Sequence, residues 1–360
     1  MKERFNSMKK TYFPEISFVR AIACLLVILT HVTLAYPIEH LNSPTLFTLL
    51  INQLARVGTP IFALISGLLL FNSSKNKKLN IKTFYKTRFD KIVIPYLFWT
   101  IIYLILVKLT HAQSFQMKDM MRYIFLGEGY VHLYFMVVVI QFYLLFPLIT
   151  KFINRNNILV VTLITTAFTA GWYLIRNDQP FDLFLHRAFL LNWLAYFFMG
   201  GFMALHMDKV KIWCSQHFSS LSIAVLVSII LMLAEMKLPH LYQSDRVANL
   251  LFVPVFTAFF MSLFHVKAND RWKSILEYIG DRSMGIYLVH LLVIGVMGNI
   301  LPASFWNPDF MFIHYILVIL CTLAVTEIIV TIPKSYYVFP VSKRITINRQ
   351  ELIKHSFYVR

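Results

Sequence analysis

The stretch "VRAIACLLVILTHV", residues 19 to 32, decides how this chain is interpreted. It is an apolar helix with Arg20 near its start and His31 near its end, and Cys24 is its only other ionisable residue. An arginine within a membrane span costs on the order of 3 kcal/mol to insert, so such residues normally face the bundle interior and have a partner or a task. Eleven residues make three helical turns plus about 20°, so both side chains point the same way, roughly 16 Å apart along the axis.

Apolar runs of similar length recur along the whole chain. Of its 360 residues 58% are apolar and 14% are charged, whereas a soluble chain has about 25% charged residues. The sequence therefore predicts an all-α, polytopic membrane helix bundle, with one membrane domain at 1–335 and a basic tail at 336–360. We expect about ten transmembrane helices, at 17–38, 46–71, 92–109, 130–150, 158–176, 187–206, 219–236, 249–267, 279–300 and 310–332.

The net charge of +17 is distributed unevenly along the chain. Most Lys and Arg residues lie in segments that alternate spans place on one side, above all 72–91 and the C-terminal tail. This distribution predicts that both termini are cytoplasmic. We expect the chain to be a multi-pass protein of a bacterial plasma membrane. The charge distribution makes nucleic acid an unexpected partner. The three cysteines are scattered and predict neither a disulfide framework nor a metal site.

Further polar residues fall at depths that match the first span. In the second span Asn52, Gln53 and Arg56 come near the level of His31, just before a break at Gly58 and Pro60. Two later segments add to them: "SMGIYLVH" (283–290) places Tyr287 and His290 near mid-membrane, and "GEGYVHLYF" (127–135) places Glu128 and His132 at the outer surface. Polar groups gathered at one depth in a bundle indicate a substrate path.

Structural interpretations of the first-span pair stay open. Arg20 lies near the cytoplasmic end of its span, so it can reach the inner headgroups or pair with Glu327 of the last span. His31 can be a neutral residue that forms hydrogen bonds between helices.

The basic segment "KNKKLNIKTFYKTRFDK" (75–91) also has two interpretations. It can simply keep this loop inside and bind anionic lipid. Alternatively, it binds a phosphorylated cytoplasmic substrate such as coenzyme A, because Arg88 and Lys91 sit one turn apart and suit a phosphate. Lys86 would contribute a third charge.

Five motifs follow one another along nearly the whole chain. They are Arg20 and His31 with ten residues between them, "VGTPIFALISG" (57–67) with Ser66, "RFDKIVIPY" (88–96), "HLYF" (132–135) and "SMGIYLVH" (283–290). In this order they resemble the acyltransferase 3 family of integral-membrane acyltransferases. Two positions differ from the family pattern: Lys91 stands where arginine is commoner, and Phe62-Ala63 stands where paired aromatics are usual. The layout is most similar to the standalone branch that modifies, or has been proposed to export, secreted exopolysaccharide.

The resemblance implies an enzyme that transfers an acyl group, usually acetyl from acetyl-CoA, to a hydroxyl of a cell-envelope glycan. Acyl-CoA would be a substrate and no bound cofactor is expected. His31 would be the general base or would itself accept the acyl group, and Arg20 would hold the donor. Arg88, Lys91 and Lys86 would bind the donor phosphates.

On the acceptor side, Arg56 or the helix break beside it would stabilise the oxyanion. His290, Tyr287 and Ser66 would line the acceptor side, with Glu128 and His132 at the outer mouth. An exporter or flippase of a polysaccharide or lipid-linked glycan, and a non-catalytic subunit, are the alternatives.

Overall fold

The computed structural model describes residues 13–39, 45–75, 79–110, 116–176, 187–235, 244–266 and 269–341. Within these ranges the chain is helical and contains no strand. Nine helical segments are long and apolar enough to cross a membrane, which confirms the predicted polytopic helical fold. They are α2 (Pro14–Glu39), α3 (Leu46–Ala55) with α4 (Gly58–Ser74), α5 (Ile81–Arg88) with α6 (Ile94–Thr110), α8 (Tyr134–Phe152), α9 (Ile158–Arg176), α12 (Phe218–Glu235), α13 (Asn249–Val266), α15 (Ser283–Ile300) and α16 (Met311–Thr331). Four shorter helices are α7 (Met120–Phe125), α10 (Leu194–Leu205), α11 (Met207–Gln216) and α14 (Asp270–Asp281).

The sixth predicted span, 187–206, differs from expectation. Its helix α10 has only 12 residues, about 18 Å of length, which is too short to cross the apolar layer alone. The helix is buried against α4 at a very close approach. A Cβ on Gly200 would lie 1.9 Å from the Leu64 carbonyl oxygen, and one on Gly67 would lie 2.1 Å from that of Phe197. Small residues allow such backbone contact between membrane helices, so α10 is a half-length helix inside the bundle.

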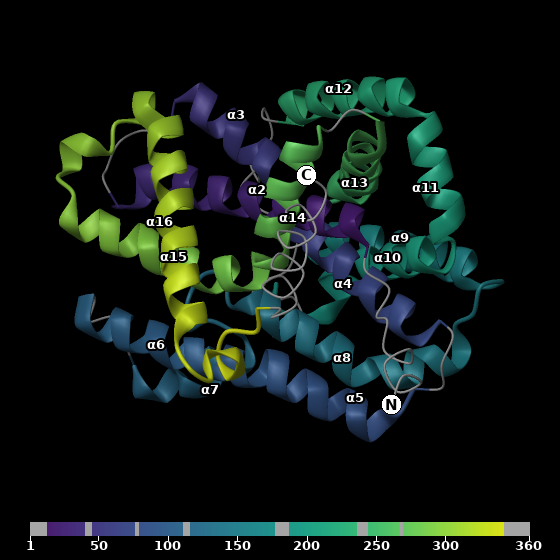
Figure 1. The fold of residues 1–360 in the computed structure, drawn as a ribbon, viewed down its shortest axis with the longest axis horizontal. Helices are drawn as coiled ribbons and strands as arrows, with labels where there is room; N and C mark the ends of the chain where they lie inside the picture. The colour runs from purple at the N-terminus through teal and green to yellow at the C-terminus, as the bar shows by residue number, and fades with distance from the viewer. Residues whose placement is uncertain are drawn as a thin grey trace, which may run out of the picture.

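Helix α2 lies at the centre of the bundle. It contacts α3, α4, α13, α14, α15 and α16, and in Figure 1 it runs across the middle, with α15 and α16 on one side and α12 and α13 on the other. At its first turns Ser17 Oγ donates to Asp281 Oδ1 at 2.7 Å, and further along Tyr315 OH donates to the Leu25 carbonyl at 3.0 Å. We call inner the end where α2 begins, which the charge pattern predicts to be cytoplasmic, and outer the opposite end.

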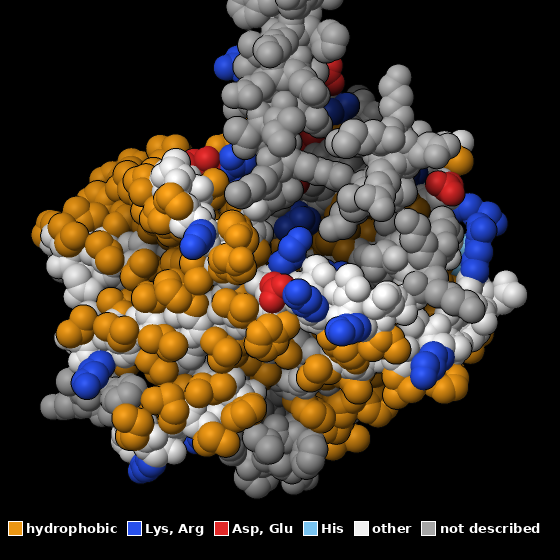
Figure 2. Space-filling model, turned by 60° about the horizontal axis from the view of Figure 1, so that its bottom comes forward, with side chains coloured by type: hydrophobic (Ala, Val, Ile, Leu, Met, Phe, Trp, Pro, Cys, Tyr) orange, Lys and Arg blue, Asp and Glu red, His pale blue; other side chains and the backbone are white. Residues whose placement is uncertain are grey.

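The sides of the bundle are hydrophobic. Helices α5, α6, α7 and α8 lie along the bottom of Figure 1. Figure 2 brings this side toward the viewer, and hydrophobic side chains cover much of it. Ile101 and Leu109 of α6 and Leu144 and Phe152 of α8 are 57%, 79%, 59% and 68% exposed. A soluble monomer rarely exposes apolar patches of this extent, so lipid is the expected surroundings of these faces.

Candidate active site

Three histidines from distant segments meet inside the bundle. The ring centroids of His31 (α2) and His290 (α15) are 5.2 Å apart, and those of His290 and His132 are 5.3 Å apart. His132, which precedes α8, is 2% exposed. It is therefore buried, whereas the sequence predicted it at the outer surface. The reason is a turn at Gly127, whose φ of +67° favours glycine and which directs the following segment inward.

A group of tyrosines surrounds this histidine cluster. Tyr287 OH donates a hydrogen bond to the His132 carbonyl, and the two rings are 5.0 Å apart. The Tyr103 ring stacks on Tyr130 at 4.4 Å and lies 5.0 Å from the His132 ring. Tyr103 OH in turn donates to the Leu288 carbonyl at 2.7 Å. These contacts fix α15 and the 127–133 segment against α6, so the imidazoles are held by a rigid frame.

The hydrogen bonds of His290 determine which ring nitrogen holds its proton. Nδ1 lies 2.8 Å from the Tyr287 carbonyl oxygen and 3.2 Å from that of Ile286. A carbonyl oxygen only accepts, so we assign the proton of the neutral ring to Nδ1. Nε2 then is an acceptor, and it is buried with no hydrogen-bond partner in the described part of the chain.

His31 is the most accessible of the three imidazoles. It lies deep among protein atoms yet is only half-buried, whereas His290 and His132 are 0% and 2% exposed. A reacting hydroxyl needs to come within hydrogen-bond distance of its base. Only His31 therefore presents substantial surface to a substrate, with the other two histidines behind it.

Arg20 occupies the inner part of the same helix. Its Nη2 donates to Ser283 Oγ, the first residue of α15, at 2.8 Å, and the side chain is half-buried. Glu327, the partner that the sequence suggested, instead accepts hydrogen bonds from Arg282. Arg20 and His31 both face α15, whose Ser283 and His290 they meet about two turns apart, which agrees with the predicted common face.

Arg56 is placed by a chain of hydrogen bonds that starts beside His31. Asn52 donates from Nδ2 to the Thr30 carbonyl at 3.1 Å and to Thr33 Oγ1 at 2.7 Å, and its Oδ1 accepts from Arg56 Nε at 2.8 Å. Thr30 and Thr33 flank His31 on α2, so Asn52 fixes the height of Arg56 relative to that imidazole. Arg56 is 4% exposed, at the break between α3 and α4 that Gly58 and Pro60 predicted.

The predicted donor residues lie in the last turn of α5 and just beyond it. Lys86 and Lys91 are exposed, and Arg88 is half-buried, with its guanidinium 5.2 Å from the Phe84 ring centroid and 4.9 Å from that of Tyr143. A π-helical segment, Phe89–Val93, separates Arg88 from α6. π-Bulges are rare overall, but those that occur are often at functional sites. A π-helical turn holds more residues than an α-helical one, so the predicted regular one-turn spacing of Arg88 and Lys91 does not apply here.

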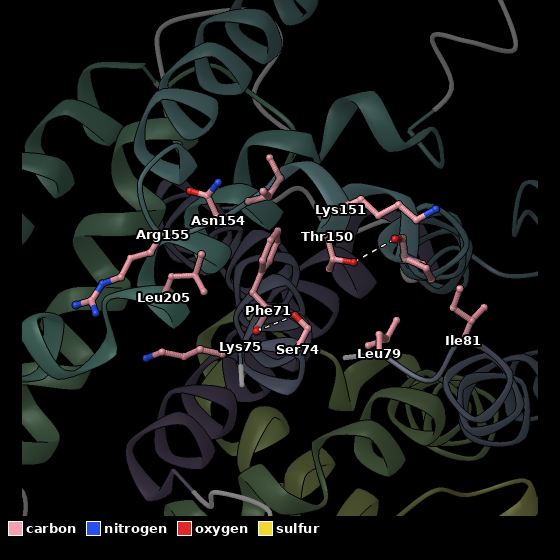
Figure 3. Close-up of a pocket in the computed structure, with 12 residues that line it drawn as sticks. Phe71, Ser74, Lys75, Leu79, Ile81, Thr150, Lys151, Asn154, Arg155 and Leu205 are labelled. Carbon is pink, nitrogen blue, oxygen red and sulfur yellow. Dashed lines mark hydrogen bonds between the residues drawn. The ribbon is translucent and has the colours of Figure 1, made fainter. Parts of the chain in front are cut away.

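A basic pocket of about 780 Å³ opens beside these residues (Figure 3). Its cations are Lys75 at the end of α4, Lys151 of α8 and Arg155 of the following loop, and Phe71 and Leu205 are among its apolar lining. The volume is within the range of small-molecule sites. An aromatic series joins the pocket to Arg88, because Phe71 contacts Phe146 and Phe146 stacks on Phe84.

Two predicted residues lie apart from the histidine cluster. Glu128 forms an ion pair with Arg122 at 2.9 Å on the outer side. Ser66 is half-buried on α4, and in the described part of the chain no hydrogen bond joins it to the histidines. Neither position tests their predicted roles in acceptor binding.

Sequence reasoning missed Asn52 as a positioning residue, and it missed Arg187 and Arg246. Arg187 lies before α10 and its Nη2 donates to Tyr134 OH at 3.0 Å. Arg246 lies before α13 and its Nη1 donates to Gln53 Oε1 at 2.8 Å. Arg187 and Arg246 lie at or just before the start of a predicted span, and nothing in their local sequence indicates that they turn inward toward Arg56.

Comparison with known proteins agrees with this geometry. The family model described as an acyltransferase domain, acyltransferase 3, matches residues 13–331. The chain belongs to the acyltransferase 3 family. The match includes both residues of the Arg20–His31 pair and all three histidines of the cluster. Membership supports acyltransferase activity in general terms, and it confirms the resemblance that the five motifs indicated.

Relatives in the acyltransferase 3 family are linked by name to an exopolysaccharide. The chain is 29% identical over 209 residues to a "Probable poly-beta-1,6-N-acetyl-D-glucosamine export protein" of Staphylococcus aureus (strain MRSA252), covering 54% of this chain and 58% of that protein. It is 26% identical over 215 residues to a protein of the same name from Staphylococcus epidermidis, covering 56% and 59%. The match thus spans a little over half the length of these relatives. No solved structure matches the chain.

Proposed function

We propose that the chain is a membrane O-acyltransferase that moves an acyl group, expected to be acetyl, from cytoplasmic acyl-CoA to a hydroxyl of a cell-envelope or secreted glycan. The observation that carries the proposal is the arrangement on α2. An accessible imidazole, His31, is backed by His290 and His132, and Arg20 lies three turns away toward the inner end. A base at mid-depth and a cation nearer the donor side suit a reaction between partners from opposite sides of a membrane.

The proposed chemical step uses His31 as a general base. Its imidazole takes the proton of the glycan hydroxyl while the oxygen attacks the thioester carbonyl, and the carbon–sulfur bond then breaks. The leaving thiolate then receives that proton from His31, so the products are the O-acyl glycan and free CoA. In the two-step alternative His31 first accepts the acyl group and then passes it to the hydroxyl.

On the donor side, we place the phosphates of acyl-CoA among the inner cations. Lys86, Arg88 and Lys91 remain the candidate residues, and the pocket with Lys75 and Lys151 adds positive charge beside them. Arg20 would hold the pantetheine or pyrophosphate end nearer to the histidines. Charge-assisted hydrogen bonds to phosphate are the strong ones, which favours this end of the bundle for the donor.

Acyl transfer by purified protein tests the proposal. The protein in detergent is given [¹⁴C]acetyl-CoA and β-1,6-linked N-acetylglucosamine oligomers, and labelled glycan and free CoA are measured. His31→Ala is expected to lower the rate by at least 100-fold, the usual contribution of a positioned base. His217→Ala is the matched control, because this half-buried histidine stacks on Trp213 in the α11–α12 region, away from the cluster. Wild-type rates in correctly folded His31→Ala protein would refute the assignment.

Polysaccharide export is the second candidate function, and the names of the staphylococcal relatives favour it. An exporter moves glycan without consuming acyl-CoA. In a strain that lacks the chain, glycan of unchanged acylation retained inside the cell would support export. Secreted glycan that has lost an O-acyl mass would support acyl transfer.

A further inference from the structure

Three arginines converge at the outer end of the bundle from three separate segments. Arg56 follows α3, Arg187 precedes α10 and Arg246 precedes α13. The charges of Arg187 and Arg246 both act on Arg56, and those of Arg56 and Arg187 both act on the His31 imidazole. We call these three residues the outer arginine cluster. It adjoins the histidine cluster on the side away from Arg20.

Neutral side chains hold the outer arginine cluster in place. Asn52 accepts from Arg56 Nε at 2.8 Å and Gln53 accepts from Arg246 Nη1 at 2.8 Å, so adjacent residues of α3 position two of the cations. The third, Arg187, packs over the Tyr134 ring at 4.0 Å and donates to its hydroxyl. These neutral partners fix the positions of the three guanidinium groups.

Positive charge exceeds negative charge in this region. Among the residues that the structure describes, two carboxylates accompany the three arginines: Asp245, 3% exposed, and Glu235, 3.5 Å from Arg246. A buried charge without a counter-charge is costly. Two donors also lack an acceptor in the described part of the chain. They are Arg187 Nε and the Nε2 of Gln53, a side chain that is 1% exposed.

We infer that the outer arginine cluster, with Gln53, binds an anionic group, a carboxylate or a phosphate, of the substrate that reacts at His31. An anion supplies the missing charge, and its oxygens supply acceptors for the two unpaired donors. The hydrogen-bond chain from Thr30 and Thr33 through Asn52 to Arg56 fixes the distance between the anion and the imidazole. The site thus selects substrates that have a negative charge at a set distance from the reacting group.

This inference rests on the proposed function for the identity of the substrate, but anion binding itself is measurable without any transfer. The unfolding temperature of the purified full-length protein is measured in sodium phosphate and sodium succinate against sodium chloride of equal ionic strength. A ligand that binds the native state raises this temperature in a saturable way. We expect such a rise with at least one of the two anions.

Variants assign the binding to the cluster. Arg187→Gln and Gln53→Leu are each expected to weaken the apparent affinity at least tenfold. Lys151→Gln tests whether the inner pocket is the source, and Arg271→Gln controls for an exposed arginine on α14. The inference is overturned if there is no saturable rise, or if the rise survives both Arg187→Gln and Gln53→Leu. It is equally overturned if Lys151→Gln alone removes the rise.

Two further arms identify the source of the anion. If the acyl group supplies a distal carboxylate, Arg187→Gln lowers the rate of thioester consumption with succinyl-CoA and not with acetyl-CoA. If the acceptor supplies it, the variant lowers acetyl transfer to poly(glycerol phosphate) and not to neutral β-1,6-linked N-acetylglucosamine oligomers. Anion binding that depends on Arg187, in a protein that transfers no acyl group to any acceptor, would refute the proposed function while leaving the anion site standing.

Discussion

Replacing Asn52 by leucine tests whether the position of Arg56 relative to His31 matters for the reaction. Asn52 is 2% exposed, and we expect it to act through Arg56 and not on the substrate itself. Its side chain makes three hydrogen bonds, two to α2 on either side of His31 and one to Arg56. Leucine is similar in size and can form none of them, so Asn52→Leu releases Arg56 while the apolar packing is largely kept.

The expected magnitude follows from those three bonds. In helical membrane proteins a side-chain hydrogen bond contributes about 0.6 kcal/mol on average, so three contribute about 2 kcal/mol. The bond to Arg56 favours the placed guanidinium directly, and the two bonds to α2 hold the Asn52 amide where it can form that bond. Loss of all three lowers the population of correctly placed Arg56 by at most roughly thirtyfold, because each 1.4 kcal/mol is a factor of ten. We expect kcat/KM for acyl transfer to fall by up to this factor, together with a loss of about 2 kcal/mol in stability.

The assay compares kcat/KM and resistance to unfolding in the same preparations. Ser262→Ala is the control: it removes the buried hydrogen bond from Ser262 Oγ to the Cys214 carbonyl at 2.6 Å, near the inner end of α13. This control should lose stability and keep kcat/KM. If Asn52→Leu also loses stability with unchanged kcat/KM, the position of Arg56 has no role in the reaction.

Two further predictions concern the packing of α10 and the donor side. Gly200→Ala should destabilise the protein by about 1–3 kcal/mol, because the new Cβ would meet the Leu64 carbonyl oxygen at 1.9 Å; Gly171→Ala, which meets nothing within 4 Å, should be neutral or stabilise by up to about 1 kcal/mol. Equal unfolding temperatures for the two variants would contradict this close approach. Neutralising Arg88 and Lys91 together, as Arg88→Gln and Lys91→Gln, should raise the KM for acyl-CoA about a hundredfold with little change in kcat, since each of the two lost charged phosphate contacts contributes about 1.5 kcal/mol. An unchanged KM, equal to that of a Lys209→Gln control at an exposed site on α11, would exclude these residues from donor binding.

Much of the fold follows directly from the sequence. Membrane spans are local features, because a run of about 20 apolar residues inserts whatever its neighbours are. The common face of Arg20 and His31 is also local, since helical periodicity alone aligns residues eleven apart. The meeting of Arg20 with Ser283 and of His31 with His290 on one helix, α15, confirms that alignment.

The tertiary structure alone decided the features that depend on contacts between distant segments. The half-length α10 follows from its close packing on α4, which hydropathy cannot report. The burial of His132 requires the 127–133 segment to turn inward against Tyr103 and Tyr287.

The convergence of Arg187 and Arg246 on Arg56 depends on two connecting segments that have no sequence periodicity. The sequence by itself therefore determined the long membrane-spanning helices, with α10 as the exception, and the pair of residues that share one face of α2. Only the packing of those helices decided which polar groups surround that pair, because hydrogen bonds and charges act through space between segments far apart along the chain.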